Sequence, residues 1–314
     1  MKKLGLAGVF LGLLAFSEAG GTAYFYRRTM IRNNVKVERT MKMSGTDWSQ
    51  YLPKLQPKKE YLMAQPREDI YQESDDGLML HASWIPNNNA KKVAICFHGY
   101  TSKGMSDYVG LSDYYLHNGY AMLLPDARAH GESEGHYIGF GCKDRYDALM
   151  WIKWVSQTCG EDVQILIHGT SMGGATVLMA SGLELPEQVK GIVSDCAFTS
   201  PKYVFTHVLH SMYHLPAFPM IQIADRVNKK KAGYGLDECN AAREVQKAKI
   251  PVLLIHGGDD RFVLCDMGHE NYAHCAARSK QLLVVPGAGH GLSYMVDREA
   301  YLDALESFLR SVLD

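Results

Sequence analysis

The stretch that decides the fold lies near the middle of the chain and reads Ile165-Leu166-Ile167-His168-Gly169-Thr170-Ser171-Met172-Gly173-Gly174-Ala175. It begins as an apolar run typical of a buried strand, continues as Gly-x-Ser-x-Gly, and ends in small residues that suit the start of a helix. A serine at such a sharp strand-to-helix turn has a strained backbone, and the flanking glycines leave room for the neighbouring strand and helix. We therefore expect the Ser171 hydroxyl to project from the turn, at a helix N-terminus that favours negative charge.

Short apolar runs recur on both sides of this stretch and alternate with segments of helix length. Expected strands cover residues 70–74, 78–85, 93–97, 120–124, 163–167, 192–194, 252–255 and 282–285, and expected helices cover 106–118, 143–159, 173–182, 266–277 and 297–313. Asp75-Asp76-Gly77 is a tight-turn signal that makes the first two strands an antiparallel hairpin. The later strands are apolar throughout, which indicates that both of their faces are covered. The sequence thus predicts an α/β fold with a mostly parallel eight-stranded sheet flanked by helices.

One segment, residues 197–249, interrupts the alternation of strands and helices. Prolines at 201, 216 and 219 punctuate helical pieces there, and no strand is expected. We expect this insertion to form a small helical cap over the sheet. Its apolar and adaptable side chains suit an acyl or aromatic ligand; they are Tyr203, Phe205, Met212, Tyr213, Phe218 and Met220.

Composition excludes several classes of protein. The chain has 314 residues, of which 46% are hydrophobic and 21% charged, so disordered and fibrous classes are excluded. A net charge of -1, without a dense cluster of Lys and Arg, argues against a nucleic-acid partner. The 7 cysteines are widely spread and contain no Cys-x-x-Cys pair, which excludes a disulfide scaffold and a zinc ribbon.

The N-terminus carries a separate signal. Lys2 and Lys3 precede the apolar run Leu4–Phe16, which fits a secretory signal peptide, and small residues at 15, 17 and 19 offer a cleavage site. Alternatively, residues 4–26 are long enough to span a bilayer as a membrane anchor, although Glu18 weakens that reading; a buried core helix is a third alternative. We expect residues 1–26 to be a signal peptide or a membrane anchor, so that the protein is secreted or membrane-anchored. Basic residues flank the apolar segment on both sides, which leaves its orientation in a membrane open.

Residues 27–68 are polar and rich in lysine, and we expect a stalk or N-terminal extension before a domain at 69–314.

A serine hydroxyl is too weakly acidic to attack a substrate alone, so it needs a base that an acid holds in place. His290 lies in a glycine-rich loop after the last expected strand. Asp259 and Asp260 follow the strand before it, and Asp195 ends the strand at 192–194. These positions all fall at the carboxyl ends of parallel strands, where open α/β sheets gather their sites.

Several motifs together carry a resemblance to a known family. They are His98-Gly99 after the third strand, Asp126-x-Arg128-x-His130-Gly-x-Ser133 after the fourth, the turn at 169–173, His256-Gly-x-x-Asp260-x-x-Val263, and Gly289-His290. With these motifs in this order, residues 69–314 resemble the α/β-hydrolase superfamily, and within it the branch of bacterial esterases and serine-aminopeptidase-like proteins. Ala129, where glycine is usual, and Leu264, where proline is common, depart from the pattern without touching the site residues.

The resemblance implies roles for individual residues. Ser171 is the expected nucleophile, His290 the base and Asp260 the acid, because Asp260 stands four residues after His256 as the family spacing requires. The backbone N–H groups of Tyr100 and Met172 are the expected oxyanion hole, a role for which their side chains should matter little. No cofactor and no metal are expected. His207, His210 and His214 share one helical face, but no carboxylate or cysteine accompanies them, so we interpret them as a wet face or a pocket wall.

We expect a hydrolase of a carboxylic ester that carries an apolar acyl or aromatic group, so the partner is a small-molecule acyl substrate. A serine peptidase or amidase is the alternative; it usually needs an acidic pocket for a substrate amine, and the cap residues Asp225, Asp237 and Glu238 leave that open. A hypothesis of another class is a membrane-tethered binding protein that keeps the fold without the chemistry.

Overall fold

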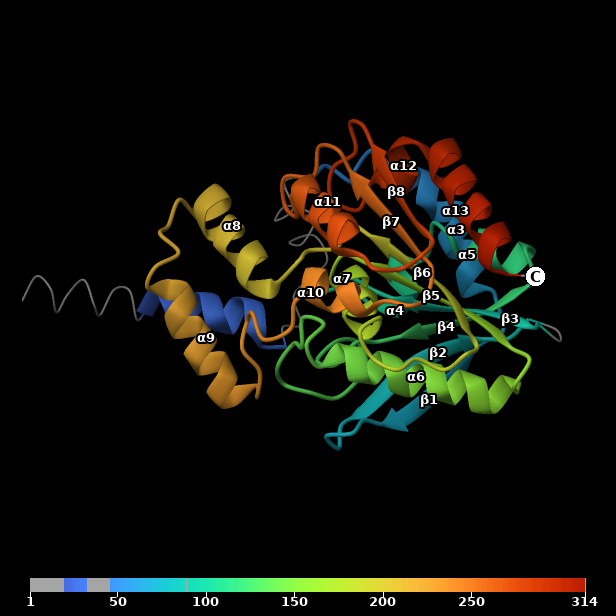
Figure 1. Cartoon of the computed structure of the whole chain (residues 1–314), viewed down its shortest axis with the longest axis horizontal. Helices are drawn as coiled ribbons and strands as arrows, with labels where there is room; N and C mark the ends of the chain where they lie inside the picture. Colours follow the sequence, from blue (N-terminus) through green and yellow to red (C-terminus); the bar gives the residue numbers. More distant parts are fainter. Residues whose placement is uncertain (1–19, 33–45, 88–89, 314) are drawn as a thin grey trace, which may run out of the picture.

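Eight strands form one sheet at the centre of the molecule, in the order β1-β2-β4-β3-β5-β6-β7-β8 (Figure 1). The computed structural model describes residues 20–32, 46–87 and 90–313. The strands are β1 (Glu68–Glu73), β2 (Met79–Ile85), β3 (Lys92–Phe97), β4 (Tyr120–Pro125), β5 (Gln164–Thr170), β6 (Val189–Asp195), β7 (Val252–Gly257) and β8 (Lys280–Val285). β2 pairs antiparallel with β1 and β4, and every other neighbouring pair is parallel. The predicted hairpin and the mostly parallel sheet are therefore confirmed.

Helices cover both faces of this sheet. They are α3 (Leu52–Met63), α4 (Gly104–Asp107), α5 (Ser112–His117), α6 (Asp144–Cys159), α7 (Met172–Ala180), α8 (Pro201–Tyr213), α9 (Met220–Lys231), α10 (Ala241–Glu244), the 3-10 turn η1 (Val245–Lys247), α11 (Cys265–His274), α12 (Ser293–Val296) and α13 (Arg298–Val312). The helix expected at 106–118 is two short helices, α4 and α5. The helical conformation is interrupted between α4 and α5. In this interval, buried Tyr108 donates its hydroxyl to the carbonyl oxygens of Phe97 and His168, at 3.1 and 2.8 Å.

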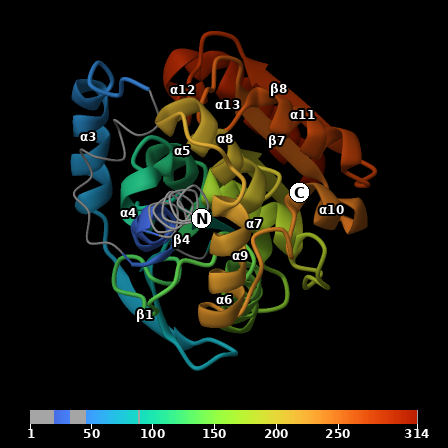
Figure 2. The ribbon, with the colours of Figure 1, turned by 90° about the vertical axis from the view of Figure 1, so that its left-hand side faces the viewer.

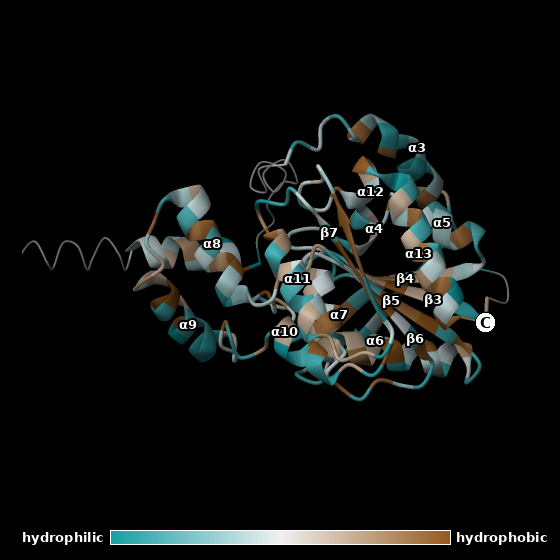
Figure 3. Ribbon diagram, turned by 45° about the horizontal axis from the view of Figure 1, so that its top comes forward, coloured by the Kyte–Doolittle hydropathy of each residue, from teal (hydrophilic) through white to brown (hydrophobic). Residues whose placement is uncertain are grey.

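Successive side chains in each strand point to opposite faces of the sheet, so a separate core lies on each face. In β3, Val93 and Ile95 pack into the core that contains α6 and α7, whereas Ala94 and Cys96 face the core that contains α5 and α13. Figure 3 shows the apolar strands enclosed between helices whose outer surfaces are more polar. Burial on both faces explains why these strands read as continuous apolar runs.

The cap helices α8 and α9 project away from the sheet, and residues 20–30 form a helix beside them (Figures 1 and 2). Tyr26 donates its hydroxyl to Asn228 Oδ1 at 3.2 Å, and the rings of Phe25 and Tyr213 meet edge to face with centroids 4.6 Å apart. Tyr26 and Met30 are buried in the main core. Residues that the sequence assigns to a leader and a stalk are thus packed against the cap and the main core.

Arg32 continues this contact beyond the helix. Its guanidinium donates to the carbonyl oxygens of Gly131 and Ser133, and its backbone N–H donates to His136 O at 2.8 Å. Among the described residues, no helix combines the length and the apolar character that a membrane span requires. The apolar run Leu4–Phe16, on which the prediction of a signal or anchor depends, lies outside the described residues.

Candidate active site

Ser171 lies at the turn between β5 and α7, with a backbone φ of 54° and ψ of -110°. This strained conformation is the one that the Gly-x-Ser-x-Gly spacing predicts. Glycine is required at 173 because a Cβ there would collide with the backbone of Phe97, at the end of β3, and of His98 in the loop that follows. The Ser171 N–H donates to the carbonyl oxygen of Asp195 at 2.8 Å, which ties the turn to the end of β6.

The hydroxyl of Ser171, the ring of His290 and the carboxylate of Asp260 form a continuous chain. Ser171 Oγ is 2.9 Å from His290 Nε2, and His290 Nδ1 is 2.7 Å from Asp260 Oδ2. A carboxylate only accepts hydrogen bonds, so Nδ1 carries the proton, and Nε2 of the neutral ring accepts the serine hydroxyl. The structure therefore brings together the three residues expected to act as nucleophile, base and acid.

The loop after β7 holds Asp260 firmly. Asp260 Oδ1 accepts the N–H groups of Phe262 and Val263, both at 2.9 Å, and His256 Nε2 donates to Val263 O at 2.8 Å. Burial alone would raise the pKa of Asp260, but the charge of His290 and the hydrogen bonds from His256 and His290 hold it well below its usual range. Asp260 therefore stays ionised and can orient the imidazole.

His290 lies in the loop after β8, and its backbone N–H donates to Thr46 Oγ1 at 3.2 Å. Burial lowers its pKa, but the charge and hydrogen bond of Asp260, and then the charges of Asp195 and Asp107, outweigh burial and raise the pKa above 6.5. The ring therefore accepts a proton more readily than a free histidine does, as a general base must.

The other two candidate acids are placed differently. Asp259 is exposed, and its backbone N–H donates to Ala288 O at 2.9 Å. Asp195 is buried, and burial raises the pKa of its carboxyl to about 6. Of the three candidate acids, Asp260 is the one whose carboxylate accepts the hydrogen bond of His290.

The loop after β3, residues 98–102, approaches Ser171, and the N–H groups on either side of Tyr100 are engaged. The Gly99 N–H donates to Asp107 Oδ2 at 2.6 Å, the Thr101 N–H to His130 Nε2 at 3.1 Å, and the Ser102 N–H to Gly99 O at 3.2 Å. The Tyr100 N–H has no acceptor in the part of the chain that the structure describes. Met172 begins α7, so its N–H has no partner within the helix either. Both N–H groups are thus available for an oxyanion.

Two histidines support this loop. His98 Nε2 accepts the Ala127 N–H at 2.9 Å while Nδ1 donates to Gly99 O at 2.7 Å. His130 likewise accepts at Nε2 and donates from Nδ1 to Arg128 O at 3.0 Å. Burial, together with the nearby His98, lowers the pKa of His130 to about 3. The loop after β4 thus holds the loop after β3 without carrying charge on His130.

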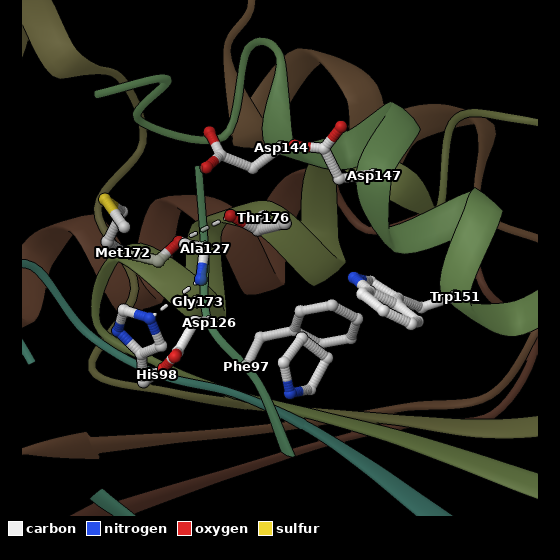
Figure 4. A pocket seen from close by; sticks show the side chains of 11 residues that line it. Phe97, His98, Asp126, Ala127, Asp144, Asp147, Trp151, Met172, Gly173 and Thr176 are labelled. Carbon is white, nitrogen blue, oxygen red and sulfur yellow. Dashed lines mark hydrogen bonds between the residues drawn. The ribbon is translucent and has the colours of Figure 1, made fainter. Parts of the chain in front are cut away.

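A small pocket lies behind the turn at Ser171 (Figure 4). Its lining includes His98, Met172 and Thr176, and the Thr176 hydroxyl donates to Met172 O at 2.9 Å. Ser171 is not among the lining residues, so the pocket belongs to the interior that supports the first turn of α7.

The three cap histidines are engaged separately. His207 Nε2 donates to Arg261 O at 2.8 Å, which connects α8 to the loop that carries Asp260. His210 Nε2 accepts the Ala217 N–H at 3.2 Å, and His214 ends α8 with a φ of 53°. Within residues 20–32, 46–87 and 90–313, no three His, Cys, Asp or Glu side chains are grouped to hold a metal ion.

Sequence reasoning missed three contacts with the site. Asp107 and Thr46 lie in stretches without a motif, and Thr46 contacts His290 across 244 positions of the chain. The side chain of Tyr100 is also engaged, because its hydroxyl donates to the carbonyl oxygens of Arg28 and Thr29 at 3.3 and 3.1 Å. The contacts of Thr46 and Tyr100 join segments 244 and 71 positions apart, which no local pattern signals.

Comparison with protein families and with individual proteins agrees with this architecture. Residues 112–314 match the model of the prolyl oligopeptidase family (Peptidase_S9). The chain is 27% identical over 231 residues to YqkD of Bacillus subtilis (strain 168), covering 73% of this chain and 74% of that protein. It is 24% identical over 256 residues to YfhR of Escherichia coli (strain K12), covering 79% and 82% respectively.

Solved structures extend the comparison to the fold. The Pyrococcus furiosus esterase Pf2001 superposes with a TM-score of 0.64 at 26% identity, covering 81% of this chain and 95% of that one. The dienelactone hydrolase of Anabaena variabilis superposes with a TM-score of 0.57 at 17% identity, covering 79% and 99%. The second likeness, at this identity, concerns the fold alone.

Proposed function

This chain belongs to the prolyl oligopeptidase family of α/β hydrolases, and from that premise we propose that it cleaves a carboxylic ester through an acyl-enzyme on Ser171. The observation that carries the proposal is the chain of hydrogen bonds from Ser171 through His290 to Asp260, at 2.9 and 2.7 Å, beside two available N–H groups. A structural serine at this turn would need neither the base nor the free donors.

In the proposed mechanism, His290 Nε2 takes the proton of Ser171 as Oγ attacks the acyl carbon. The oxygen of the tetrahedral intermediate accepts the N–H groups of Tyr100 and Met172, each worth roughly 3–4 kcal/mol of transition-state stabilisation when well placed. His290 then gives the proton to the leaving alcohol, and a water molecule repeats the sequence to release the acid. Asp260 holds the tautomer that this transfer needs and stabilises the imidazolium.

A row of aromatic rings supports an apolar acyl or aromatic substrate. Tyr100 stacks on Phe140 with centroids 5.4 Å apart, and Phe140 meets Phe205 of α8 edge to face at 4.9 Å. The row leads from the expected oxyanion loop to the cap, so an apolar group that entered between them would meet aromatic surface.

A peptidase or amidase is the second candidate, and the match to the prolyl oligopeptidase family favours it. The acidic cap residues support a peptidase less than the sequence suggests. Asp225 Oδ1 accepts the Leu236 N–H at 2.7 Å, Glu238 Oε2 accepts the Gly235 N–H at 2.9 Å, and Asp237 lies 3.8 Å from Arg243. Because these carboxylates already have partners within the cap, we place ester hydrolysis first.

The decisive experiment treats the full chain with a fluorophosphonate probe and with nitrophenyl esters of short and long acyl chains. We expect labelling and turnover that disappear in Ser171→Ala and persist in Ser156→Ala, a matched change on α6. Aminoacyl anilides tested beside the esters separate esterase from peptidase. A wild-type chain that neither labels nor turns over any of these substrates would instead support a binding protein that keeps the fold without the chemistry.

A further inference from the structure

Asp107 stands at the end of α4 with an exposed carboxylate that contacts the oxyanion loop at two points. Oδ2 accepts the Gly99 N–H at 2.6 Å, and Oδ1 accepts the hydroxyl of Ser102 in a short hydrogen bond. Both donors are neutral. Asp107 takes part in none of the ion pairs found among the described residues, so its negative charge is not neutralised by a basic side chain there.

The carboxylate lies close to the nucleophile. A Cβ placed on Gly99 would be 3.3 Å from Asp107 Oδ2 and 3.4 Å from Ser171 Cβ, so both groups border the same small space. An uncompensated charge at this distance acts on whatever charge develops during the reaction, because the screening by solvent is incomplete near a protein surface.

Asp107 also determines which N–H of the loop remains free. It holds the residue before Tyr100 through the Gly99 N–H, and His130 holds the residue after it through the Thr101 N–H. With both neighbours anchored, the Tyr100 N–H is the donor left for an oxyanion. The carbonyl oxygen of the Gly99–Tyr100 peptide itself accepts His98 Nδ1 at 2.7 Å and the Ser102 N–H at 3.2 Å, and Asp107 fixes the peptide before it. An oxyanion donor works only when it is preorganised, so loss of Asp107 should loosen the loop around the Tyr100 N–H.

His290 is faced by carboxylates from three directions. Asp260 at the end of β7 contacts it directly, Asp195 lies at the end of β6, and Asp107 lies on α4. His256 is the nearby titratable group on the far side of Asp260, 3.5 Å from Oδ2. Asp107 is the exposed member of this set, so its charge can be removed without leaving a buried group unpaired.

We propose that Asp107 is a positioning residue, whose carboxylate anchors the His98–Gly99 peptide next to the oxyanion hole and whose charge stabilises the imidazolium of His290. The inference rests on the proposed hydrolase function. It assigns two separable effects to one side chain, an anchoring effect that depends on a hydrogen-bond acceptor and an electrostatic effect that depends on charge.

Two substitutions in the full chain separate these effects. Asp107→Asn keeps an oxygen that accepts the Gly99 N–H but removes the charge that stabilises the imidazolium, so kcat should fall by about threefold, less than in Asp107→Ala. The acid limb of its kcat/KM profile should move to lower pH. Asp107→Ala removes the acceptor as well, and kcat should fall by about tenfold to a hundredfold with KM nearly unchanged, because a misaligned oxyanion donor acts on the transition state. Asp113→Asn, which removes a similar charge paired with Lys58, is the matched control.

A titration that needs no substrate completes the test. The imidazole resonance of His290, assigned by its loss in His290→Gln, should titrate at lower pH in Asp107→Asn and at the wild-type pH in Asp113→Asn. An unchanged titration in Asp107→Asn, or a kcat in Asp107→Ala within twofold of wild type, would overturn the proposal. A wild-type chain without turnover would refute the proposed function instead, and the titration alone would then decide the role of Asp107.

Discussion

At the scale of single residues, the site depends on how completely Asp260 is engaged. Oδ1 accepts two backbone N–H groups and Oδ2 accepts the ring of His290, so the carboxylate has one orientation available to it. The neighbouring Asp259 is chemically identical and lacks all three contacts. The spacing from His256 predicts this difference, because His256 holds Val263 O and closes the loop around Asp260.

Replacing Asp260 by Asn should abolish most of the activity. An amide in this position favours the wrong tautomer of His290, and kcat should fall by about 10³- to 10⁴-fold. Steady-state kinetics on a nitrophenyl ester measure the loss, and circular dichroism checks the fold. Asp259→Asn is the matched control, and comparable losses in both variants would contradict the assignment of the acid.

The pH dependence of the wild-type enzyme follows from His290. Its pKa is raised in the folded protein, chiefly by Asp260 against the opposing effect of burial, and the reaction needs the neutral ring. Activity should therefore be full at high pH and fall as the pH drops through a value above 6.5. A kcat/KM profile from pH 4 to 9 tests this, and an acid limb centred well below 6.5 would contradict it.

At the scale of elements, the helix over residues 20–30 is the part that sequence reasoning could not place. The strands, the hairpin and the turn at Ser171 are local patterns, so apolar runs and glycine spacing predict them. The contact of Tyr26 with Asn228 joins residues 202 positions apart, and no composition or periodicity encodes such a pairing. The helix expected at 106–118 is divided at residues 108–111, where buried Tyr108 contacts the carbonyl oxygens of Phe97 and His168, and no local pattern signals those contacts.

The Tyr100 hydroxyl connects this helix to the loop after β3, which makes the contribution of this contact measurable. Tyr100→Phe removes the bonds to the carbonyl oxygens of Arg28 and Thr29 but keeps the ring on Phe140. A hydrogen bond of this kind is worth about 1 kcal/mol, so kcat should fall about fivefold if the loss is felt in the transition state. Tyr26→Phe removes a comparable hydroxyl that contacts the cap, and should lower thermal stability while leaving kcat within twofold. Equal effects of both variants on kcat would contradict a specific link to the oxyanion loop.

At the scale of the whole molecule, Arg128 joins three regions that are distant in the sequence. From the loop after β4 it donates to both oxygens of Asp147 on α6 at 2.7 Å, and to Asp76 in the β1–β2 turn at 2.9 and 3.1 Å. Arg128 and Asp147 are both buried. Burial raises the pKa of Asp147 to about 6, although Arg128 opposes the rise.

The stability of the fold should therefore depend on Arg128 in a pH-dependent way. Arg128→Met leaves a buried carboxylate unpaired, which costs roughly 3–5 kcal/mol of unfolding free energy. The pKa of Asp147 is about 6 in the folded protein and 3.8 in the unfolded chain, so between these pH values the folded state binds a proton that the unfolded state does not. Protonation of Asp147 therefore stabilises the fold at low pH, and this stabilisation is lost as the pH rises through about 6. Removing Arg128 strengthens that preference for the protonated form. Urea denaturation should accordingly show a larger loss at pH 8 than at pH 5, and Asp147→Asn in the Arg128→Met background should restore part of the stability at pH 8. An equal loss at both pH values would mean that Arg128 acts through its contacts with Asp76 or through packing, and not through the charge of Asp147.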